Sequence, residues 1–266
     1  GDPVIQIGTV FYKLGDPITK IERTIVTLGT CDDIPGCDVL ISCKTEAEVL
    51  IAWSKLIREK NPQYITGYNI FGFDFKYVWD RAKELKIHDN PDFAELGIRN
   101  DRNSDLKHKQ LTSSALGDNS LHFIDMDGRV LFDLQKEVQK EHNLASYKLD
   151  NVAAEFMRGN ITRNKPTKER KDKQFIFTND IGTLIKGKYI KIVEYNSIGE
   201  QFYEKGKKFK IRGVNRDQLF LIVEGEFTMN PEYKYKWCEA KDDISPQDIF
   251  RKQKEGSKER AEIAKY

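Results

Sequence analysis

The chain has 266 residues, of which 39% are hydrophobic and 32% are charged. A chain of this length and composition can bury a hydrophobic core, and it has room for one large domain or for a domain with an insertion. No apolar run approaches the length that spans a bilayer, so we expect neither a membrane-spanning helix nor a membrane partner. The formal net charge of +2 neither favours nor excludes a nucleic-acid partner.

Positive charge is concentrated in one stretch of the chain. Residues 158–217 contain 16 Lys and Arg against 7 Asp and Glu, so the remainder is net negative. A mildly acidic body with one basic stretch is typical of a protein that meets a polyanion on one face. The alternative is a solvated loop region, which would suffice for residues 163–173 by themselves.

The four cysteines lie at positions 31, 37, 43 and 238. The first three are six residues apart, which is not the short Cys-x-x-Cys spacing of a zinc site. Scattered cysteines in a chain of this size indicate reduced thiols in an intracellular protein.

The two ends of the sequence indicate a fragment of a longer polypeptide. There is no starting Met and no signal peptide, and the chain runs directly into an apolar strand at Val4. It closes at residues 261–266 within a helical pattern that has no Gly, Asn or Pro to stop it.

Strands alternate with helices in the first part of the chain. Apolar strands are predicted at residues 4–12, 24–28, 39–41 and 64–68. A capping box, Thr45 with Glu48, opens a helix after the third strand, and a second helix follows Asp74. Short loops between alternating elements predict an α/β domain.

In the middle of the chain, at residues 100–157, the sequence predicts a loop, a hairpin and two helices. Residues 100–119 are polar and loop-like. Asp127-Gly128, flanked by alternating apolar residues, is a strong hairpin signal that would join strands at 121–126 and 129–133. Helices are predicted at 134–142 and 149–157.

The character of the sequence changes after residue 157. A charged linker, 163–173, precedes five short strands separated by glycines, which suggest a small SH3-like β-barrel. The predicted strands are 183–185, 189–193, 201–203, 208–211 and 219–223. Helix resumes at Ser245-Pro246, a good N-cap followed by a good first helical residue, so we expect the β-rich part to be an insertion. The expected domains are 1–157, an inserted basic subdomain at 158–243, and a C-terminal helix of the first domain at 244–266.

One acid, Asp74, lies at the junction between a predicted strand and a predicted helix. A carboxylate at this edge of the sheet, half out of water, could hold a divalent cation. The alternative is that Asp74 is only a helix N-cap, because negative charge is favoured beside the free N–H groups at a helix start.

Several segments, taken together in order, resemble the 3′–5′ exonuclease domain of family-B DNA polymerases related to eukaryotic DNA polymerase delta. Their details are also similar to the DNA polymerases of large DNA viruses. The resemblance covers about residues 2–157 and 245–266. Its segments are Asp2–Ile7, Ile65–Ile70 running into Phe73-Asp74, Gly128-Arg129-Val130 with Asp133, and Ser146–Val152.

The resemblance implies an RNase H-like exonuclease fold and hydrolysis of the primer 3′ terminus by two Mg²⁺ or Mn²⁺ ions, with Asp74 as a catalytic metal ligand. Two cations stabilise the attacking and leaving oxygens together, and they need several placed carboxylates. The family's other acidic motifs would fall before Gly1 and beyond Tyr266. We therefore expect this fragment alone to be inactive.

The same resemblance places Asn69, Phe71 and Phe73 beside the frayed primer end. Asn69 could hydrogen-bond the nucleotide, and an aromatic ring could stack on a base. The alternative is that both phenylalanines are core residues, and for Phe73 we favour the core. Gly72 replaces a polar residue found in many relatives, which removes a side-chain contact from that position.

Other candidates are weaker. The four histidines, at positions 88, 108, 122 and 142, have no spacing that suggests a metal site or a triad, and they are expected at the surface or in the hairpin. Asp125, Asp127 and Asp133 are explained by strand alternation and the turn. In the insertion, residues 205–210 with Tyr189, Tyr195 and Tyr203 could contact the DNA backbone or a replication partner, or could be only structural.

The sequence therefore predicts the proofreading exonuclease region of a replicative DNA-directed DNA polymerase. Its partners would be the primer–template with its single-stranded 3′ end, dNTPs at a polymerase site outside this segment, and a processivity factor. It would act in the nucleus or in a viral replication compartment. The alternative is a non-catalytic RNase H-like module that binds DNA or a partner.

Overall fold

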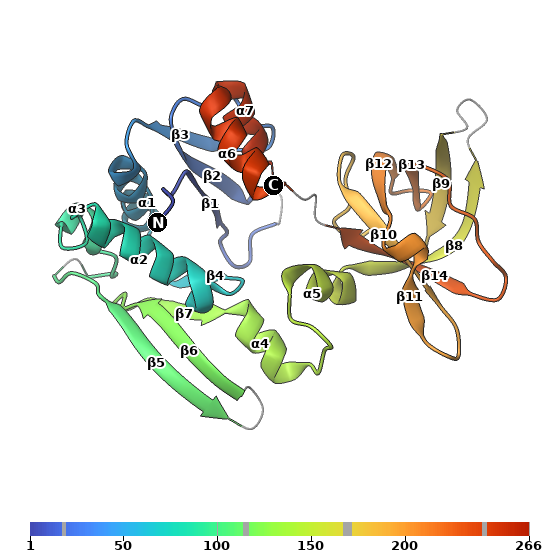
Figure 1. Cartoon of the computed structure of the whole chain (residues 1–266), viewed down its shortest axis with the longest axis horizontal. Helices are drawn as coiled ribbons and strands as arrows, with labels where there is room; N and C mark the ends of the chain where they lie inside the picture. Colours follow the sequence, from blue (N-terminus) through green and yellow to red (C-terminus); the bar gives the residue numbers. More distant parts are fainter. Residues whose placement is uncertain (18–19, 100, 114–116, 167–171, 241–243, 266) are drawn as a thin grey trace. The chain divides into compact units, whose positions relative to one another are not determined.

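The computed structural model describes residues 1–17, 20–99, 101–113, 117–166, 172–240 and 244–265. The chain divides into two compact units (Figure 1). Unit 1 comprises Gly1–Asn143 with Ile244–Tyr266, and unit 2 is Leu144–Asp243. Unit 1 is mixed α/β and unit 2 is mainly β, so the chain as a whole belongs to the predicted α/β class.

Three small sheets make up the β structure of unit 1. Their strands are β1 Gln6–Phe11, β2 Glu22–Leu28, β3 Val39–Cys43, β4 Tyr64–Gly67, β5 Leu106–Ser113, β6 Gly117–Ile124 and β7 Val130–Asp133. β1 pairs antiparallel with β2, and β2 pairs parallel with β3. β4 and β7 form a parallel pair, and β5 and β6 form an antiparallel hairpin.

The helices of unit 1 surround these sheets. They are α1 Glu46–Lys60, the π-helical turn η2 Ile70–Asp74, α2 Phe75–Glu84, α3 Pro91–Ala94, α4 Leu134–Glu141, α6 Pro246–Glu255 and α7 Ser257–Ile263. The predicted capping box of α1 is confirmed, because Thr45 Oγ1 accepts from the N–H of Glu48 while the Glu48 carboxylate accepts from the N–H of Thr45. Ser245 is the N-cap of α6, as predicted, and its Oγ accepts from the N–H of Asp248 at 3.1 Å.

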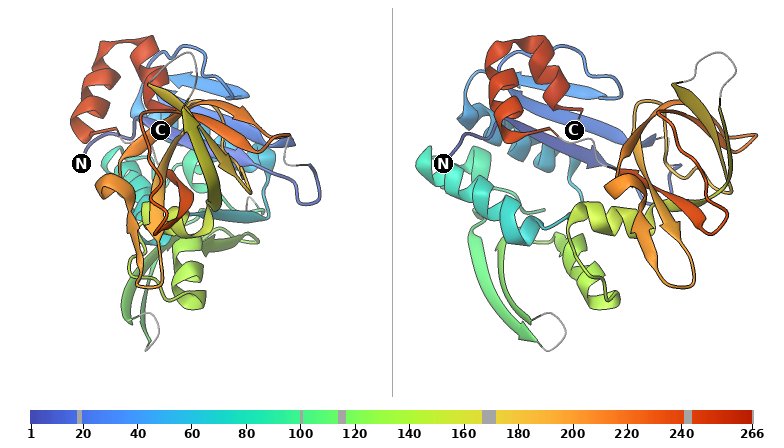
Figure 2. Two further views of the ribbon diagram at one scale, coloured as in Figure 1. Left: turned by 90° about the vertical axis from the view of Figure 1, so that its right-hand side faces the viewer. Right: turned by 45° about the vertical axis from the view of Figure 1, so that its right-hand side comes forward.

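The core of unit 1 joins residues from its strands and from its helices α1 and α2. Val26 of β2 packs in one cluster with Leu50 and Trp53 of α1 and Trp79 of α2. The last two helices, α6 and α7, lie beside β1 and β2 in the views of Figure 2. Hydrogen bonds hold them there: Gln253 Nε2 donates to Leu28 O at 2.8 Å, and Gln6 Nε2 donates to Arg260 O at 2.8 Å.

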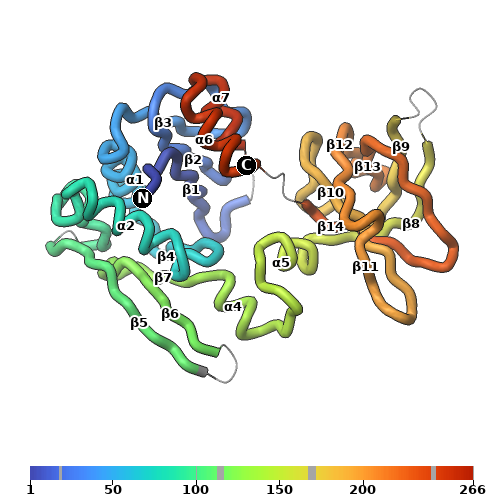
Figure 3. The backbone as a smooth tube through the Cα atoms, viewed as in Figure 1, coloured from blue at the N-terminus to red at the C-terminus, as the bar shows by residue number. Residues whose placement is uncertain are grey.

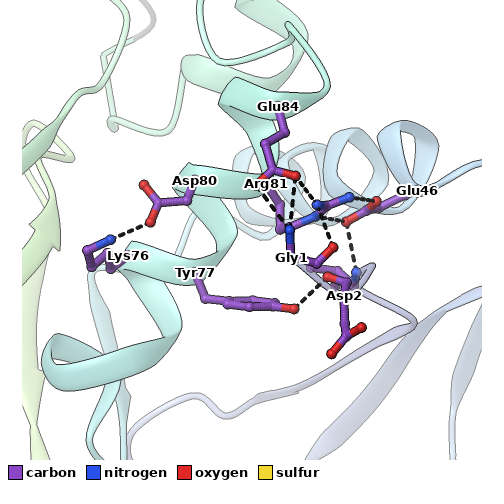
Figure 4. Close-up of polar contacts among 9 residues, drawn as sticks. Gly1, Asp2, Glu46, Lys76, Tyr77, Asp80, Arg81 and Glu84 are labelled. Atoms are coloured by element: carbon purple, nitrogen blue, oxygen red, sulfur yellow. Dashed lines mark hydrogen bonds and ion pairs between the residues drawn. The ribbon is translucent and has the colours of Figure 1, made fainter. Parts of the chain in front are cut away.

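A buried ion pair connects α1, α2 and the start of the chain (Figure 4). Arg81 Nε donates to Glu46 Oε1 at 2.7 Å, Arg81 Nη2 donates to Glu46 Oε2 at 2.5 Å, and the N–H of Val4 donates to the same carboxylate at 2.8 Å. Burial alone would raise the pKa of Glu46, but the hydrogen bonds from Arg81 and Val4 outweigh it and lower the pKa.

The hairpin predicted at Asp127-Gly128 is wrong. The turn itself forms, since the N–H of Arg129 donates to Met126 O at 3.0 Å and Gly128 has φ +80°. Its flanking strands do not pair with each other, because β7 takes β4 as a parallel partner and β6 pairs with β5. The loop expected at 100–119 is also partly wrong, because β5 and the start of β6 lie in it.

In its described residues, unit 2 consists of one seven-stranded sheet, one α-helix and the short 3₁₀ helix η3 Tyr203–Lys205 (Figure 3). Its elements are α5 Leu149–Phe156, β8 Arg158–Pro166, β9 Lys173–Thr178, β10 Tyr189–Tyr195, β11 Glu200–Phe202, β12 Lys208–Asn215, β13 Phe220–Glu224 and β14 Lys234–Ala240. The strand order is β11-β10-β12-β13-β9-β8-β14, and β10 also pairs with β14. Ile176, Ile190, Phe209 and Leu221 are fully buried in its core.

The strands of the insertion differ from their prediction. β8 and β9 occupy residues 163–166 and 173 of the stretch expected to be a linker, whose residues 167–171 lie outside the described part, and residues 183–185 are not a strand. An SH3-like barrel of the five predicted strands is therefore not confirmed. Unit 2 begins at Leu144 and includes α5, which packs with β14; the N–H of Glu239 donates to Met157 O at 3.0 Å.

Two sequence expectations concern membranes and thiols. Among the described residues, no helix combines the length and the apolar character needed to cross a bilayer. The four cysteines are free thiols.

Glu46→Gln is expected to destabilise unit 1 by about 3 kcal/mol at pH 7, because it leaves the largely buried Arg81 charge without its main partner. Since the pKa of Glu46 is lowered by folding, its contribution is complete above the ordinary carboxyl pKa and is lost as the pH falls through the lowered value. Urea unfolding at pH 7 and at successively lower pH should show the difference from wild type shrinking on acidification. Exposed Glu59→Gln is the control, and an equal effect of both substitutions would contradict the assignment.

Candidate functional site

The segment that carries the candidate residues is a tight turn between β4 and α2. β4 ends at Gly67, and Asn69 takes a left-handed backbone conformation with φ +61°. The N–H groups of Gly72 and Phe73 both donate to Asn69 O, at 3.1 and 3.0 Å. Asn69, Phe71, Phe73 and Asp74 are thereby held on a single turn.

Asp133 fixes this turn from the neighbouring strand. It lies at the end of β7, opposite Gly67 of β4, and is 1% exposed. Its Oδ1 accepts from the N–H of Asn69 at 2.8 Å and from that of Gln135 at 2.9 Å, while Oδ2 accepts from the N–H of Phe71 at 2.9 Å. Asp133 thus caps α4 and anchors the turn together, a role that sequence reasoning missed.

Two glycines allow a close approach of side chains in this turn. A Cβ at Gly72 would lie 2.2 Å from Asn69 Oδ1, and a Cβ at Gly67 would lie 2.5 Å from Ile70 Cγ2. Gly72 therefore makes room for the Asn69 amide, which explains locally why no larger side chain stands there.

The two phenylalanines of the turn have different environments. Phe71 is partly buried, with ring centroids 6.1 Å from both Phe75 and Phe123. Phe73 is 57% exposed and stacks on Tyr77 at 5.3 Å. The core placement favoured for Phe73 is wrong, because the turn directs residues 71 and 73 to opposite sides and only Phe71 meets the core.

Asp74 is an exposed carboxylate at the last position of the π-helical turn. It has right-handed helical backbone angles and makes no side-chain capping hydrogen bond to α2, so the N-cap alternative is not supported. Partial desolvation of its carboxyl group raises the pKa of Asp74, a backbone hydrogen bond opposes this, and the nearby negative charge of Asp133 raises it further. The carboxylate is thus available for a ligand rather than used to cap the helix.

The donor set fits a divalent cation only in part. Carboxylate oxygens are the ligands that Mg²⁺ prefers, and Asp74 offers them, but Asp133 is occupied by backbone N–H groups. No group of three or more His, Cys, Asp or Glu side chains gathers in the described part of the chain, the histidines included. Asp74 alone cannot hold two ions, so no hydrolytic step can be built from these residues.

Residues 1–152 match the family model described as "DNA polymerase family B, exonuclease domain". The chain belongs to this family. The exonuclease-domain match contains the whole β4–α2 turn and Asp133, and it ends before β8, the first strand of unit 2.

Curated relatives of this exonuclease domain are DNA polymerases. The DNA polymerase of Pyramimonas orientalis virus is 41% identical over all of this chain and 20% of its own length, and that of Phaeocystis pouchetii virus is 32% identical over all of this chain and 27% of its own length. The DNA polymerase delta catalytic subunit of Dictyostelium discoideum is 41% identical over 59% of the chain and 14% of its own length. The chain therefore spans about a quarter or less of each of these relatives.

Asp133→Asn is expected to lower the pKa of Asp74 toward its ordinary value, because it removes a like charge while much of the desolvation remains. It should also cost about 1–3 kcal/mol of stability, since an amide cannot accept all three N–H groups. Carboxyl ¹³C NMR titration measures the first effect and urea unfolding the second. Asp125→Asn is the control. It also removes one carboxylate, but its partner Arg102 still forms an ion pair with Asp127. A pKa of Asp74 that stays constant or rises in Asp133→Asn would contradict the coupling.

Proposed function

We propose that this domain is the 3′–5′ proofreading exonuclease region of a replicative DNA-directed DNA polymerase and acts on the single-stranded 3′ end of a primer–template. One observation carries the proposal: Asp133 holds a turn that presents an exposed carboxylate, an amide and an exposed ring together. The Asp74 carboxylate suits a phosphate-bound cation, the Asn69 amide suits a nucleotide edge, and the Phe73 ring suits a base.

Each residue of the turn has a separate proposed role. Asp74 is a metal ligand and catalytic residue. Phe73, exposed and backed by Tyr77, stacks on a base, a contact worth about 1–3 kcal/mol. Asn69 hydrogen-bonds the terminal nucleotide. Phe71, predicted as a DNA contact, instead supports the turn from the core side through Phe75 and Phe123.

The proposed cofactor is Mg²⁺ or Mn²⁺, with two ions in the intact polymerase. The cation would stabilise charge on the scissile phosphate when bound. Asp74 is the one carboxylate that this turn offers to a cation, so two ions would need further acids of the intact polymerase, and the 266-residue chain alone is expected to lack hydrolytic activity.

The remaining assignments follow from the same proposal. Residues 1–157 with 244–266 would form an RNase H-like exonuclease domain, and 158–243 an SH3-like insertion. In support of the insertion, β10 pairs with both β12 and β14, so the sheet of unit 2 curls back on itself. The whole polymerase would bind dNTPs outside this segment and a processivity factor. It would work inside the cell, in the nucleus or in a viral replication compartment, which suits its free thiols.

The second candidate is a non-catalytic RNase H-like module that binds DNA or a partner. The observation in its favour is that no cluster of metal-ligating side chains forms among the described residues. The two candidates differ in whether Asp74 is needed for cleavage or only for the shape of the turn.

Asp74→Asn in the full-length polymerase is expected to reduce release of a mismatched 3′ nucleotide by at least about 100-fold, since a neutral amide would hold the divalent cation more weakly and the cation supplies the electrostatic stabilisation of the reacting phosphate. Primer extension should continue. A gel assay on a 5′-labelled mismatched primer measures both rates.

The matched control is Asp80→Asn. Asp80 lies farther along α2 and pairs with Lys76, and its substitution should leave both mismatch release and primer extension unchanged. Undiminished cleavage by Asp74→Asn would favour the non-catalytic candidate. Asp74-dependent cleavage by the 266-residue chain itself would refute its expected inactivity.

A further inference from the structure

Unit 2 carries aromatic side chains on the side of its sheet that faces away from its core. In β9 the burial alternates: Gln174, Ile176 and Thr178 are buried, whereas Phe175 and Phe177 are only partly buried. Neither phenylalanine belongs to the hydrophobic cluster that fills the unit. The outward positions of a strand are normally polar when that face meets water, so these two rings need another explanation.

Phe220 of β13 joins them to make one cluster. It stands opposite Phe177 in the β13–β9 pairing. Its ring centroid lies 5.2 Å from that of Phe175, edge-on, and 5.6 Å from that of Phe177, while the two β9 rings are 6.4 Å apart. Three rings from two neighbouring strands therefore form a continuous surface.

Basic residues border this surface on the other neighbouring strand. In the β8–β9 register, Arg163 stands opposite Phe177 and Lys165 opposite Phe175. Both basic side chains are exposed, and the Arg163 guanidinium carbon lies 4.0 Å from the centre of the Phe177 ring. Glu224, an acid farther along β13, is already paired with Arg212 at 2.5 Å. We call Arg163, Lys165, Phe175, Phe177 and Phe220 the aromatic face.

The residues that the sequence suggested for DNA contact in this unit are different. Of those, Tyr203 packs edge-on against the buried ring of Phe227 at 5.0 Å. The aromatic face was not foreseen, because its five residues come from three strands whose pairing only the fold shows.

We propose that the aromatic face binds single-stranded DNA, with unpaired bases stacked on the three phenylalanines and phosphates paired with Arg163 and Lys165. Aromatic rings next to cationic side chains are the chemistry that binds an unpaired strand, because every base has a π-face and every linkage a negative charge. A duplex keeps its bases stacked on one another and cannot use the rings. The positive charge of residues 158–217 complements the strand.

This site goes beyond the proposed exonuclease function. It lies in unit 2, after the last residue matched by the family model, and it uses none of the residues of the β4–α2 turn. The proposed ligand is single-stranded DNA that runs over unit 2, and its binding does not depend on the reaction at the β4–α2 turn.

The test is a fluorescence-anisotropy titration of the 266-residue chain with a 5′-fluorescein oligo(dT) 20-mer at several salt concentrations. Phe177→Leu keeps an apolar side chain but removes the ring, and it should raise Kd by about five-fold or more. Phe177→Trp should restore binding. Arg163→Gln with Lys165→Gln should raise Kd and reduce the slope of log Kd against log salt by about 1.4.

The matched control is Lys148→Gln with Lys186→Gln, which removes the same charge from exposed positions on other segments of unit 2. This control should change the salt slope little. A 5-bromouracil oligonucleotide cross-linked by light should label peptides from 173–178 or 220–224, which places the strand even if a variant folds poorly.

Three results would overturn the proposal: no binding of the oligonucleotide by the wild-type chain, equal effects of the face and control variants, or cross-links confined to residues 68–77. A Phe177→Leu chain that keeps its DNA affinity but changes its oligomeric state would mean that the face meets a second copy instead. Failure here and failure of the exonuclease proposal are distinguishable, because this site is measured by the DNA affinity of Phe177→Leu and by cross-links to 173–178 or 220–224, whereas the exonuclease proposal is measured by cleavage of a mismatched primer.

Discussion

The three hydrogen bonds accepted by the buried Asp133 carboxylate hold the candidate site together. They join the end of β7, the start of α4 and the turn after β4. A carboxylate is suited to this position because it accepts several N–H groups at once, and such charge-assisted bonds are stronger than neutral ones. With Asn69 and Phe71 fixed by their backbones, Phe73 and Asp74 are directed outward. The exposed groups are therefore placed by a residue that itself cannot reach a ligand.

Features encoded within a few neighbouring residues could be predicted from the sequence. The capping box of α1 and the Ser-Pro start of α6 formed as expected, because each depends on side chains within one helical turn. The hairpin at Asp127-Gly128 failed because its turn signal is local whereas strand pairing is not. The apolar residues of β7 found a parallel partner in β4, about sixty residues earlier in the sequence. A turn dipeptide carries no information about that competitor.

For the candidate site, too, the sequence predicted the local features but not those that depend on strand pairing. The position of Asp74 between a strand and a helix followed from apolar periodicity, and its proposed role followed from a family resemblance. The exposure of Phe73 and the anchoring role of Asp133 did not follow, because both depend on which strand lies beside β4. One clue was present: a polar residue at the end of a strand, just before a helix, meets the end of any parallel neighbour. In unit 2 the same limit hid the pairing of Arg163 with Phe177.

Unit 1 is completed by a segment that follows unit 2 in the sequence. Carbonyl groups at the end of β2, those of Leu28 and Thr30, receive donors from Gln253 and Arg260 of α6 and α7. During synthesis from the N-terminus these helices emerge after the whole β-rich unit. Unit 2 can therefore acquire its own core while unit 1 still lacks two helices. Slow folding of unit 2 would delay the packing of α6 and α7 onto unit 1, which contains the Asp74 turn. The folding time of one unit would then affect that of the other.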